Sequence, residues 1–243
     1  MDILENNKLS NNTGTLMIAH RGLSGYEKEN TIPAFIAAGC RSFYGIECDI
    51  HPTSDGKYVV FHDDETKRIS PINVEIKNTT FDELKQVPLY DLKNERVVSY
   101  YKIPSLEEYI EVCMKYNKTC VIEFKNPFEE DDIKQVIKIL DEYNYLNRVI
   151  FISFFIENLK IVKRYLPTQS VQFLCSEFNE EVLTAITENK MDIDIHHSVL
   201  NKEIIDLLHS KGIKINCWTV NEKQRALELI SLGVDFITTN YFE

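Results

Sequence analysis

Apolar segments of five to seven residues alternate with longer amphipathic segments along most of the chain. The apolar segments have the length and the β-branched content of strands that are buried on both faces. Eight are predicted, at Leu16–His20, Tyr44–Ile50, Thr119–Lys125, Arg148–Ser153, Ser170–Cys175, Met191–His196, Lys214–Thr219 and Asp235–Thr239. Apolar residues at helical spacing predict helices at Ser105–Tyr116, Glu129–Tyr143, Glu157–Tyr165, Asn179–Glu188, Lys202–Lys211 and Glu222–Leu232. Eight such units predict an α/β fold, a closed (β/α)8 barrel of the TIM type.

One further apolar segment, Lys57–His62, does not fit this alternation. The residues before it, Pro52 to Gly56, are too few to hold a crossover helix between parallel strands. We therefore expect a hairpin arm beside the second barrel strand, which would carry His62 back over the mouth of the barrel. Residues 64–104 lack a clear period and predict an insertion over the same mouth, with a short helix near Phe81–Lys85. Hairpin and insertion together span about 51–104 at the C-terminal mouth.

Length and composition agree with one barrel domain over residues 1–243. A barrel of this type needs about 250 residues, and the chain has 243, with 44% hydrophobic residues, 8 Gly and 7 Pro. This is the composition of an ordinary globular domain. Residues 1–14 are mostly polar, and we expect them to form a flexible tail.

The formal net charge of −11 argues against nucleic acid as a partner, because such proteins usually carry an excess of Lys and Arg on one face. No segment reaches the roughly 20 apolar residues of a membrane span, and the polar start lacks the apolar region of a secretion signal. We therefore expect no stable membrane insertion and a cytoplasmic protein. The scattered cysteines, without CxxC spacing, are expected to be reduced. The sequence leaves the oligomeric state open.

Four short polar clusters close strand-like segments of the chain. They are His20-Arg21, Glu47-Cys48-Asp49, His62-Asp63 and Glu123-Phe124-Lys125. In barrels of this type the catalytic groups lie at the C-terminal ends of the strands or on the loops that follow. We therefore expect the four clusters to meet at one site.

The acidic residues of these clusters predict a metal site. Glu47 and Asp49 are two residues apart on one strand, so both carboxylates face the same side. Glu123 occupies the equivalent place on the next wall strand, with Lys125 two residues further on the same face. Because neighbouring inward carboxylates need a cation and oxygen ligands favour hard ions, we expect one divalent cation, Mg²⁺ or Ca²⁺ before Zn²⁺.

The basic residues complete a site for phosphodiester chemistry. An imidazole titrates near pH 6.5, so His20 and His62 are suited to take one proton and to give another. Arg21 can hold the non-bridging phosphate oxygens through its fork of donors, and Lys125 can act as a compact charge beside the metal. A divalent ion, a general base and a general acid together overcome the repulsion of the nucleophile and the poor leaving group of a phosphodiester.

Each signal has a more ordinary interpretation when it stands alone. A Glu-x-Asp pair on a strand is usually solvated, a strand-end histidine is usually structural, and a Glu-x-Lys pair is usually a surface ion pair. The hypothesis depends on the joint occurrence at consecutive strand ends. Asp192, Asp194 and His196 form one polar face of the sixth strand, which either lines the pocket or, as we expect, forms hydrogen bonds in the barrel interior. A structural role is expected for His51, and all four residues stay outside the predicted catalytic set.

The chain resembles the glycerophosphodiester phosphodiesterases over most of its length. The motifs that carry the resemblance are His20-Arg21-Gly22, Glu29-Asn30-Thr31, Ala34-Phe35, Gly45-Ile46-Glu47-Cys48-Asp49, Thr53-Ser54-Asp55-Gly56, Val59-Val60-Phe61-His62-Asp63, Ile103-Pro104-Ser105-Leu106-Glu107, Ile122-Glu123-Phe124-Lys125, Ser153-Phe154, Trp218-Thr219-Val220-Asn221 and Gly233-Val234-Asp235-Phe236-Ile237-Thr238-Thr239-Asn240. Both their order and their spacing agree with the family.

The resemblance implies a TIM-type barrel, a divalent metal on Glu47, Asp49 and Glu123, and a catalytic pair formed by His20 and His62. It also implies the substrate class, glycerophosphodiesters such as glycerophosphocholine, hydrolysed to glycerol 3-phosphate and an alcohol. Arg21, Lys125 and Trp218 are the residues that we expect to bind substrate. Trp218 ends a barrel strand and is suited to pack against a glycerol or choline group. The expected partner is therefore a small molecule.

Three departures from the family and two alternatives remain. Lys28 stands where the family usually has Pro, Asn240 where it often has Asp, and the insertion at 64–104 matches the family poorly. Any substrate contact at Asn240 would thus be neutral. A related lyase of the lysophospholipase D or sphingomyelinase D type, which forms a cyclic phosphate, is the nearest alternative. The other is a non-catalytic phosphate-binding module on the same barrel.

Overall fold

A ring of parallel strands forms the centre of the computed structural model, which describes residues 8–9 and 14–243. The strands are β1 (Leu16–Ala19), β2 (Gly45–Pro52), β6 (Thr119–Phe124), β7 (Val149–Ser153), β8 (Ser170–Cys175), β9 (Asp192–His196), β10 (Ile215–Trp218) and β11 (Phe236–Thr239). They pair in the order β1-β11-β10-β9-β8-β7-β6-β2, and β1 also pairs with β2, so the sheet closes on itself. The predicted TIM-type barrel is confirmed, and every predicted strand lies within two residues of the observed one.

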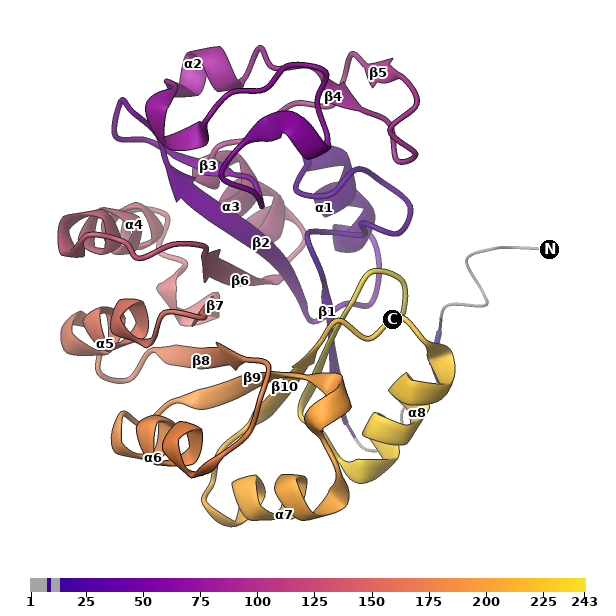
Figure 1. Ribbon diagram of the computed structural model, residues 1–243, viewed down its shortest axis with the longest axis vertical. Coiled ribbons are helices and arrows are strands. Elements are labelled where there is room, and N and C mark those ends of the chain that lie inside the picture. The colour runs from indigo at the N-terminus through magenta and orange to yellow at the C-terminus, as the bar shows by residue number, and fades with distance from the viewer. Residues whose placement is uncertain (1–7, 10–13) are drawn as a thin grey trace.

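Helices surround the barrel on its outer side (Figure 1). They are α1 (Ile32–Gly39), α3 (Leu106–Lys115), α4 (Glu130–Glu142), α5 (Ile156–Tyr165), α6 (Glu180–Glu188), α7 (Lys202–Ser210) and α8 (Lys223–Leu232), with single 3₁₀ turns at η4 (Leu146–Arg148) and η5 (His197–Val199). The six predicted helices are confirmed. The eight-residue α1 was not predicted, although it has clear start signals. The Thr31 side chain accepts a hydrogen bond from the Ala34 N–H, and Pro33 lies in the first turn.

The local sequence explains why α3 begins at Leu106 and which of its faces packs against the main core. Ser105 and Glu108 form a capping box, in which each side chain accepts a hydrogen bond from the other residue's backbone N–H. A cap of this kind contributes about 1 kcal/mol to helix stability. The buried face of α3 includes Leu106, Tyr109 and Ile110, which join the main apolar core between the barrel and the helices.

One side chain of α3 reaches between two barrel strands. The Tyr109 hydroxyl donates to the Ile46 carbonyl of β2 at 2.6 Å and accepts from the Val121 N–H of β6 at 3.1 Å. The Tyr109 ring is fully buried and packs edge-on against Phe35 at 5.0 Å. Tyr109 thereby joins the two strands that carry the predicted metal ligands.

The segment after β2 confirms the predicted hairpin. Strand β3 (Tyr58–Val60) runs antiparallel to β2, with Ile50 opposite Val60 and Pro52 opposite Tyr58. The insertion that follows contains the elements η2 (Thr66–Arg68), η3 (Ile76–Asn78), α2 (Phe81–Leu84), β4 (Leu89–Tyr90) and β5 (Val97–Val98). The predicted short helix near Phe81–Lys85 is therefore confirmed as α2.

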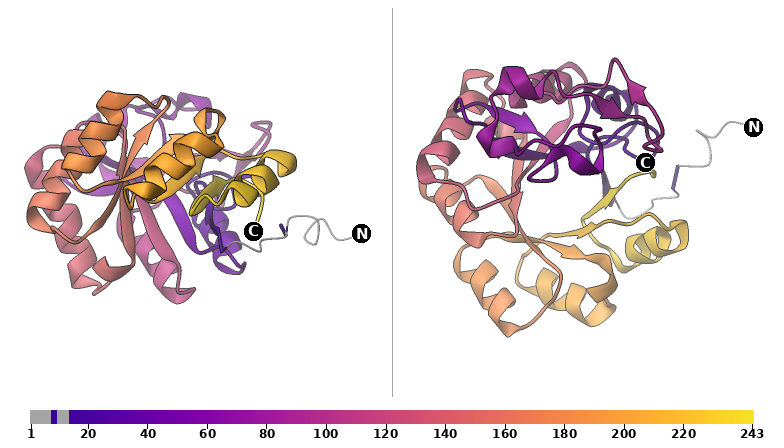
Figure 2. Two further views of the ribbon diagram at one scale, coloured as in Figure 1. Left: turned by 90° about the horizontal axis from the view of Figure 1, so that it is seen from below. Right: turned by 45° about the horizontal axis from the view of Figure 1, so that its top comes forward.

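The insertion has an apolar cluster of its own, separate from the main core. The cluster consists of Val59, Phe61, Ile69, Ile76, Leu84, Val87, Leu89, Tyr101 and Ile103. Polar contacts fix the insertion to the loop after β1. The Lys28 Nζ donates to the Asp91 carbonyl at 3.1 Å and to Asn94 Oδ1 at 2.5 Å, and the Tyr101 hydroxyl donates to Glu27 at 2.6 Å. The insertion thus lies over the β2 side of the barrel (Figure 2).

Three further expectations concern the chain as a whole. Residues 1–7 and 10–13 of the predicted flexible tail lie outside the described residues, whereas the Leu9 N–H donates to the Glu243 carbonyl at 2.9 Å. All six cysteines carry free thiols, and five of them are buried. Within the described part of the chain, no helix has both the length and the apolar character needed to cross a bilayer.

Candidate active site

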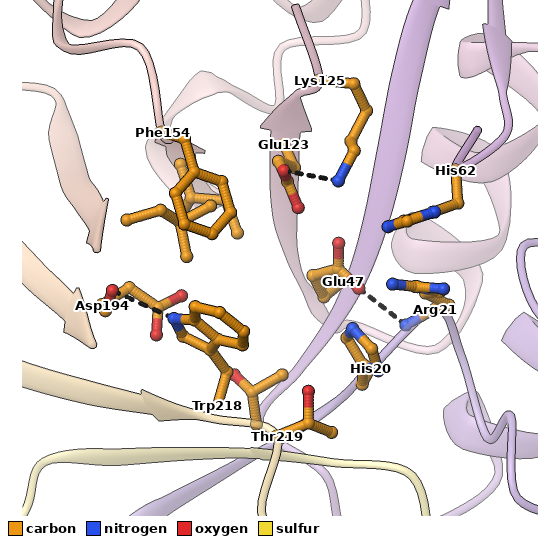
Figure 3. A pocket seen from close by; sticks show the side chains of 13 residues that line it. His20, Arg21, Glu47, His62, Glu123, Lys125, Phe154, Asp194, Trp218 and Thr219 are labelled. Atoms are coloured by element: carbon orange, nitrogen blue, oxygen red, sulfur yellow. Dashed lines mark hydrogen bonds and ion pairs between the residues drawn. The ribbon is translucent and has the colours of Figure 1, made fainter. Parts of the chain in front are cut away.

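The four polar clusters meet at the C-terminal mouth of the barrel, around a cavity of about 100 Å³. The predicted residues that line it are His20, Arg21, Glu47, His62, Glu123, Lys125 and Trp218. Figure 3 shows Glu47 and Glu123 in the middle, with Phe154 and Trp218 on one side and Arg21, His20 and His62 on the other. Asp49 is completely buried and lies beside this cavity.

The three predicted metal ligands form one cluster. One carboxylate oxygen each from Glu47, Asp49 and Glu123 lies within 4.8 Å of the others. Parallel pairing of β2 with β6 places Asp49 directly opposite Glu123 and explains this closeness. Glu47 Oε1 is buried and has no hydrogen-bond partner among the described residues.

The electrostatics of this cluster favour a cation. Burial, followed by the negative charges of Asp49 and Glu123, raises the pKa of Glu47 well above its ordinary value. Burial and Asp49 likewise raise the pKa of Glu123 to about 8. Burial also acts to raise the pKa of Asp49, but the Arg21 and Lys125 charges outweigh it and lower the pKa. An oxygen-only cluster of this kind can hold a hard divalent cation.

Arg21 contacts the cluster through both its backbone and its side chain. Its backbone N–H donates to Glu47 Oε2 at 2.7 Å, and its guanidinium Nε lies 3.3 Å from Asp49 Oδ2. This requires a sharp turn after β1, in which Arg21 itself has a φ of 54°. Gly22 follows with a φ of 78°, and a Cβ there would come within 2.7 Å of the Ala34 backbone. The turn therefore requires glycine at position 22, directly after Arg21.

Two neighbours complete the surroundings of Asp49. The Asn30 side-chain amide donates to Asp49 Oδ2 at 2.7 Å. Lys125 Nζ donates to Glu123 Oε1 at 2.8 Å and lies 3.3 Å from Asp49 Oδ1. Burial acts to lower the pKa of Lys125, but Asp49 and Glu123 outweigh it and raise the pKa, so Lys125 stays charged.

His20 is held in one orientation by the far end of the chain. Its Nδ1 donates to Asn240 Oδ1 at 2.8 Å, and the Ser24 hydroxyl reaches the same oxygen at 3.0 Å. The neutral side chain of Asn240, which stands where the family often has Asp, thus contacts His20. Burial, assisted by the Arg21 charge, lowers the pKa of His20 to about 4. His20 is thus a neutral imidazole whose Nε2 is able to accept a proton.

The hydrogen-bond partner of His62 Nδ1 is a carboxylate, whereas the partner of His20 Nδ1 is an amide. His62 Nδ1 donates to Asp63 Oδ1 at 2.5 Å, and Arg68 Nε donates to Asp63 Oδ2 at 2.6 Å. Burial and the Arg21 and Lys125 charges lower the pKa of His62, against the opposing effects of Asp49 and Asp63. His51 Nε2 lies 3.2 Å from the His62 carbonyl, which agrees with the structural role expected for it.

The aromatic side of the cavity is built around Trp218. Its ring meets Phe154 edge-on at 5.5 Å and His196 edge-on at 5.2 Å, and its Nε1 donates to the Asp194 carbonyl at 3.2 Å. The Asp194 side chain lines the cavity, whereas Asp192 Oδ1 accepts from the Lys214 N–H at 2.9 Å. Sequence reasoning therefore gave Asp194 and Phe154 too little weight.

The sequence model of the glycerophosphoryl diester phosphodiesterase family matches residues 20–243. The chain belongs to this family. Among its relatives, a glycerophosphodiester phosphodiesterase from Caldanaerobacter subterraneus is 31% identical over 233 residues, which are 93% of this chain and 94% of the relative. One from Bacillus altitudinis is 28% identical over 242 residues, 93% of this chain and 95% of the relative.

Solved structures agree with the sequence relatives. A phosphodiesterase from Oleispira antarctica, in complex with the product sn-glycerol-3-phosphate, superposes with a TM-score of 0.83 at 27% identity and covers 93% of both chains. A glycerophosphodiester phosphodiesterase from Parabacteroides distasonis gives 0.77 at 28% identity and covers 94% of this chain and 93% of its own. As a member of this family, the protein is an enzyme, a phosphodiesterase.

Proposed function

We propose that this enzyme hydrolyses glycerophosphodiesters to glycerol 3-phosphate and an alcohol, with one divalent cation and two histidines. The observation that carries the proposal is one cavity lined by His20, His62, Glu47 and Glu123 together. The product bound to the Oleispira relative supports the substrate class. The free cysteines support a cytoplasmic location, because thiols persist in a reducing compartment.

Glu47, Asp49 and Glu123 are the residues that would hold the cation. They fit one, because Glu47 Oε1 is buried without a partner in the described structure and because burial and the charge of Asp49 raise the pKa of both Glu47 and Glu123. Oxygen ligands favour Mg²⁺ or Ca²⁺. When bound, such an ion supplies Lewis-acid polarisation of the phosphoryl oxygen.

The two histidines take different roles because their partners differ. His20, with Nδ1–H donated to a neutral amide, accepts the proton of the nucleophile at Nε2. His62 is held by the Asp63 carboxylate, which favours its imidazolium form, and gives a proton to the leaving oxygen. The nucleophile is water or the glycerol 2-hydroxyl, and ³¹P NMR distinguishes them, because only the second route forms a cyclic phosphate.

Arg21 and Lys125 prepare the site for an anionic substrate. Both cations line the cavity, and both act to lower the pKa of His62. A bound phosphodiester would screen these two charges, and the pKa of His62 would rise as a result. Substrate binding would thus help to protonate the residue that must act as the acid.

The test is glycerol 3-phosphate release from glycerophosphocholine and glycerophosphoethanolamine. We expect release to stop with EDTA and to return with Mg²⁺ or Ca²⁺. His20→Ala and Glu47→Ala are expected to lower the rate by at least about 10²-fold. His209→Ala is the matched control, because His209 is a half-exposed histidine that pairs with Asp235 outside the cavity.

The two alternatives make different predictions in the same assay. A lyase would release a cyclic phosphate from lysophosphatidylcholine and little glycerol 3-phosphate from glycerophosphocholine. The cavity, at about 100 Å³, is closer in size to the smaller substrate. A binding module would bind phosphate without any metal-dependent turnover. Absence of turnover by folded, metal-loaded protein on all three substrates would contradict the proposed hydrolase.

A further inference from the structure

One buried carboxyl group of the cavity has no role in the chemistry described above. Asp194, on β9, is 1% exposed and lines the cavity. Its Oδ1 is buried and has no hydrogen-bond partner in the described part of the chain. Leaving a buried polar atom unpaired costs the free energy of its lost hydration. Such an atom in a functional cavity is therefore explained most directly by a ligand that pairs with it.

The protonation state of Asp194 decides what it can bind. Burial, followed by the negative charge of Glu123, raises the pKa of Asp194 well above its ordinary value. A protonated carboxyl group carries one O–H donor together with acceptor oxygens. This is the hydrogen-bonding pattern that suits a hydroxyl group, which is itself both donor and acceptor.

A second polar group of the same cavity, Thr238, is an acceptor. The Thr238 hydroxyl donates to Asn216 Oδ1 at 3.1 Å, and the Asn216 amide in turn donates to Gln172 Oε1 at 3.1 Å. The single hydrogen of Thr238 is thus used inside the barrel. Its lone pairs remain for a ligand in the cavity, which Thr238 lines together with Asp194.

Apolar side chains form most of the rest of this part of the cavity. Ile152, Leu174 and the Trp218 ring line it. The only polar atom of the indole is already bonded to the Asp194 carbonyl at 3.2 Å, and Phe154 packs edge-on against the ring. Figure 3 shows Asp194 and Trp218 together, across the cavity from His20 and His62.

Size limits the ligand to a small group. An engineered cavity of about 150 Å³ holds one benzene molecule, with six heavy atoms. The cavity here is about 100 Å³, which is the size of a group of a few heavy atoms, such as a three-carbon polyol. Apolar walls suit the carbon atoms of such a polyol, and two polar side chains suit its hydroxyl groups.

We propose that Asp194 and Thr238 bind the hydroxyl groups of the glyceryl moiety and so select glycerophosphodiesters from other phosphodiesters. The inference rests on the proposed function and assigns the group that recognises its substrate class. A site built to bind a hydroxyl group rejects an analogue that lacks it strongly, because its own polar atoms then stay unpaired.

The experiment compares two substrates that differ only in these hydroxyl groups, glycerophosphocholine and propylphosphocholine. If the glycerol 2-hydroxyl is the nucleophile, propylphosphocholine cannot react, and the calorimetric comparison described below takes the place of the kinetic one. In the metal-loaded wild type we expect kcat/KM to favour glycerophosphocholine by at least about 10-fold. Asp194→Leu is expected to lower kcat/KM for glycerophosphocholine by about 10–100-fold and for propylphosphocholine by less than about 3-fold. Asp194→Asn keeps a neutral donor and acceptor and is expected to retain the preference.

Asp192→Asn is the matched control. Asp192 lies on the same strand and contacts Lys214 rather than the cavity, so the preference should not change. Calorimetry with glycerol 3-phosphate and propyl phosphate gives a readout without turnover. In wild type and Asp194→Asn the first ligand should bind more tightly, and Asp194→Leu should remove the difference.

Three results would overturn the inference: no preference in the wild type, an equal loss on both substrates in Asp194→Leu, or a preference lost in Asp194→Asn. If Asp194→Leu does not fold, the substrate preferences of the wild type and of Asp194→Asn are enough to test the inference. Failure of the proposed function is a separate outcome, in which the wild type hydrolyses neither diester. The calorimetric difference between the two monoesters would still test Asp194 in that case.

Discussion

The side chain of Asn240 offers a direct test of which histidine is the base. Its Oδ1 accepts a hydrogen bond from His20 Nδ1 at 2.8 Å, in a part of the site where burial lowers the pKa of His20 to about 4. Asn240→Asp replaces the amide with a carboxylate of nearly the same shape. The substitution therefore adds one negative charge beside the imidazole and changes little else.

The size of the effect follows from the distance. Two unit charges about 4 Å apart interact by roughly 4 kcal/mol at an effective dielectric constant of about 20. One pKa unit corresponds to about 1.36 kcal/mol. The interaction can therefore raise the pKa of His20 by at most roughly 3. A neighbouring opposite charge commonly changes a pKa by about 1–3. Asn240→Asp is therefore expected to raise the pKa of His20 by about 1–3 from its starting value of about 4.

The direction of the kinetic change depends on the role of His20. A base works only when it is unprotonated, so a higher pKa moves the acid limb of the pH profile to higher pH. We expect lower kcat/KM than the wild type near pH 5 and near-equal values above pH 8. The assay is kcat/KM for glycerophosphocholine across pH 4–10 at a fixed free-metal concentration, which reports the ionisations of the free enzyme.

Ser24→Ala is the control for Asn240→Asp. It removes the second contact to Asn240 without adding charge, and the acid limb should stay close to that of the wild type. A profile of Asn240→Asp that overlies the wild type would refute the contact between Asn240 and His20. Movement of the basic limb instead would show that His20 acts as the acid and would reverse the assignment.

Tyr109→Phe is expected to lower the free energy of unfolding by about 1–3 kcal/mol in urea titrations, because it removes the hydrogen bonds of the Tyr109 hydroxyl to β2 and to β6. The exposed control Tyr100→Phe should stay within about 0.5 kcal/mol. Arg68→Lys is expected to lower kcat about tenfold with little change in KM, since an ammonium cannot reproduce the fork that holds Asp63. An unchanged kcat would contradict the role of Arg68 in positioning Asp63. Glu47→Gln is expected to abolish the metal-dependent rise in Tm, which at 100 times the Kd corresponds to about 2.7 kcal/mol in the wild type.

The barrel and its predicted ligands were accessible from sequence because both depend on simple periodicities. Strands that are buried on both faces appear as continuous apolar segments, so a polar residue such as Glu47 within β2 is conspicuous. The two-residue spacing then places Asp49 on the same face. Parallel strands in a barrel bring their C-terminal ends together, which is why Glu123 could be assigned to the same site.

The features that sequence reasoning missed depend on contacts that are distant in the chain. His20 and Asn240 are 220 positions apart, and no local pattern relates them. The helix α1 is short and contains no polar side chain, so it lacks the amphipathic period of the other helices. For Asp194 the inward direction followed from strand parity, but the absence of a partner depends on packing in the assembled barrel.

The insertion does more than cover the side of the barrel, because its Arg68 is the middle link of an ion-pair path between Arg21 and His62. Arg21 donates to Glu29 at 3.0 Å, and Arg68 of the insertion donates to Glu29 at 2.7 Å and to Asp63 at 2.6 Å. Asp63 in turn accepts from His62. A displacement of the insertion would therefore disturb His62 and Arg21 together. The insertion packs around an apolar cluster of its own, which helps to hold Arg68 in its place on this path.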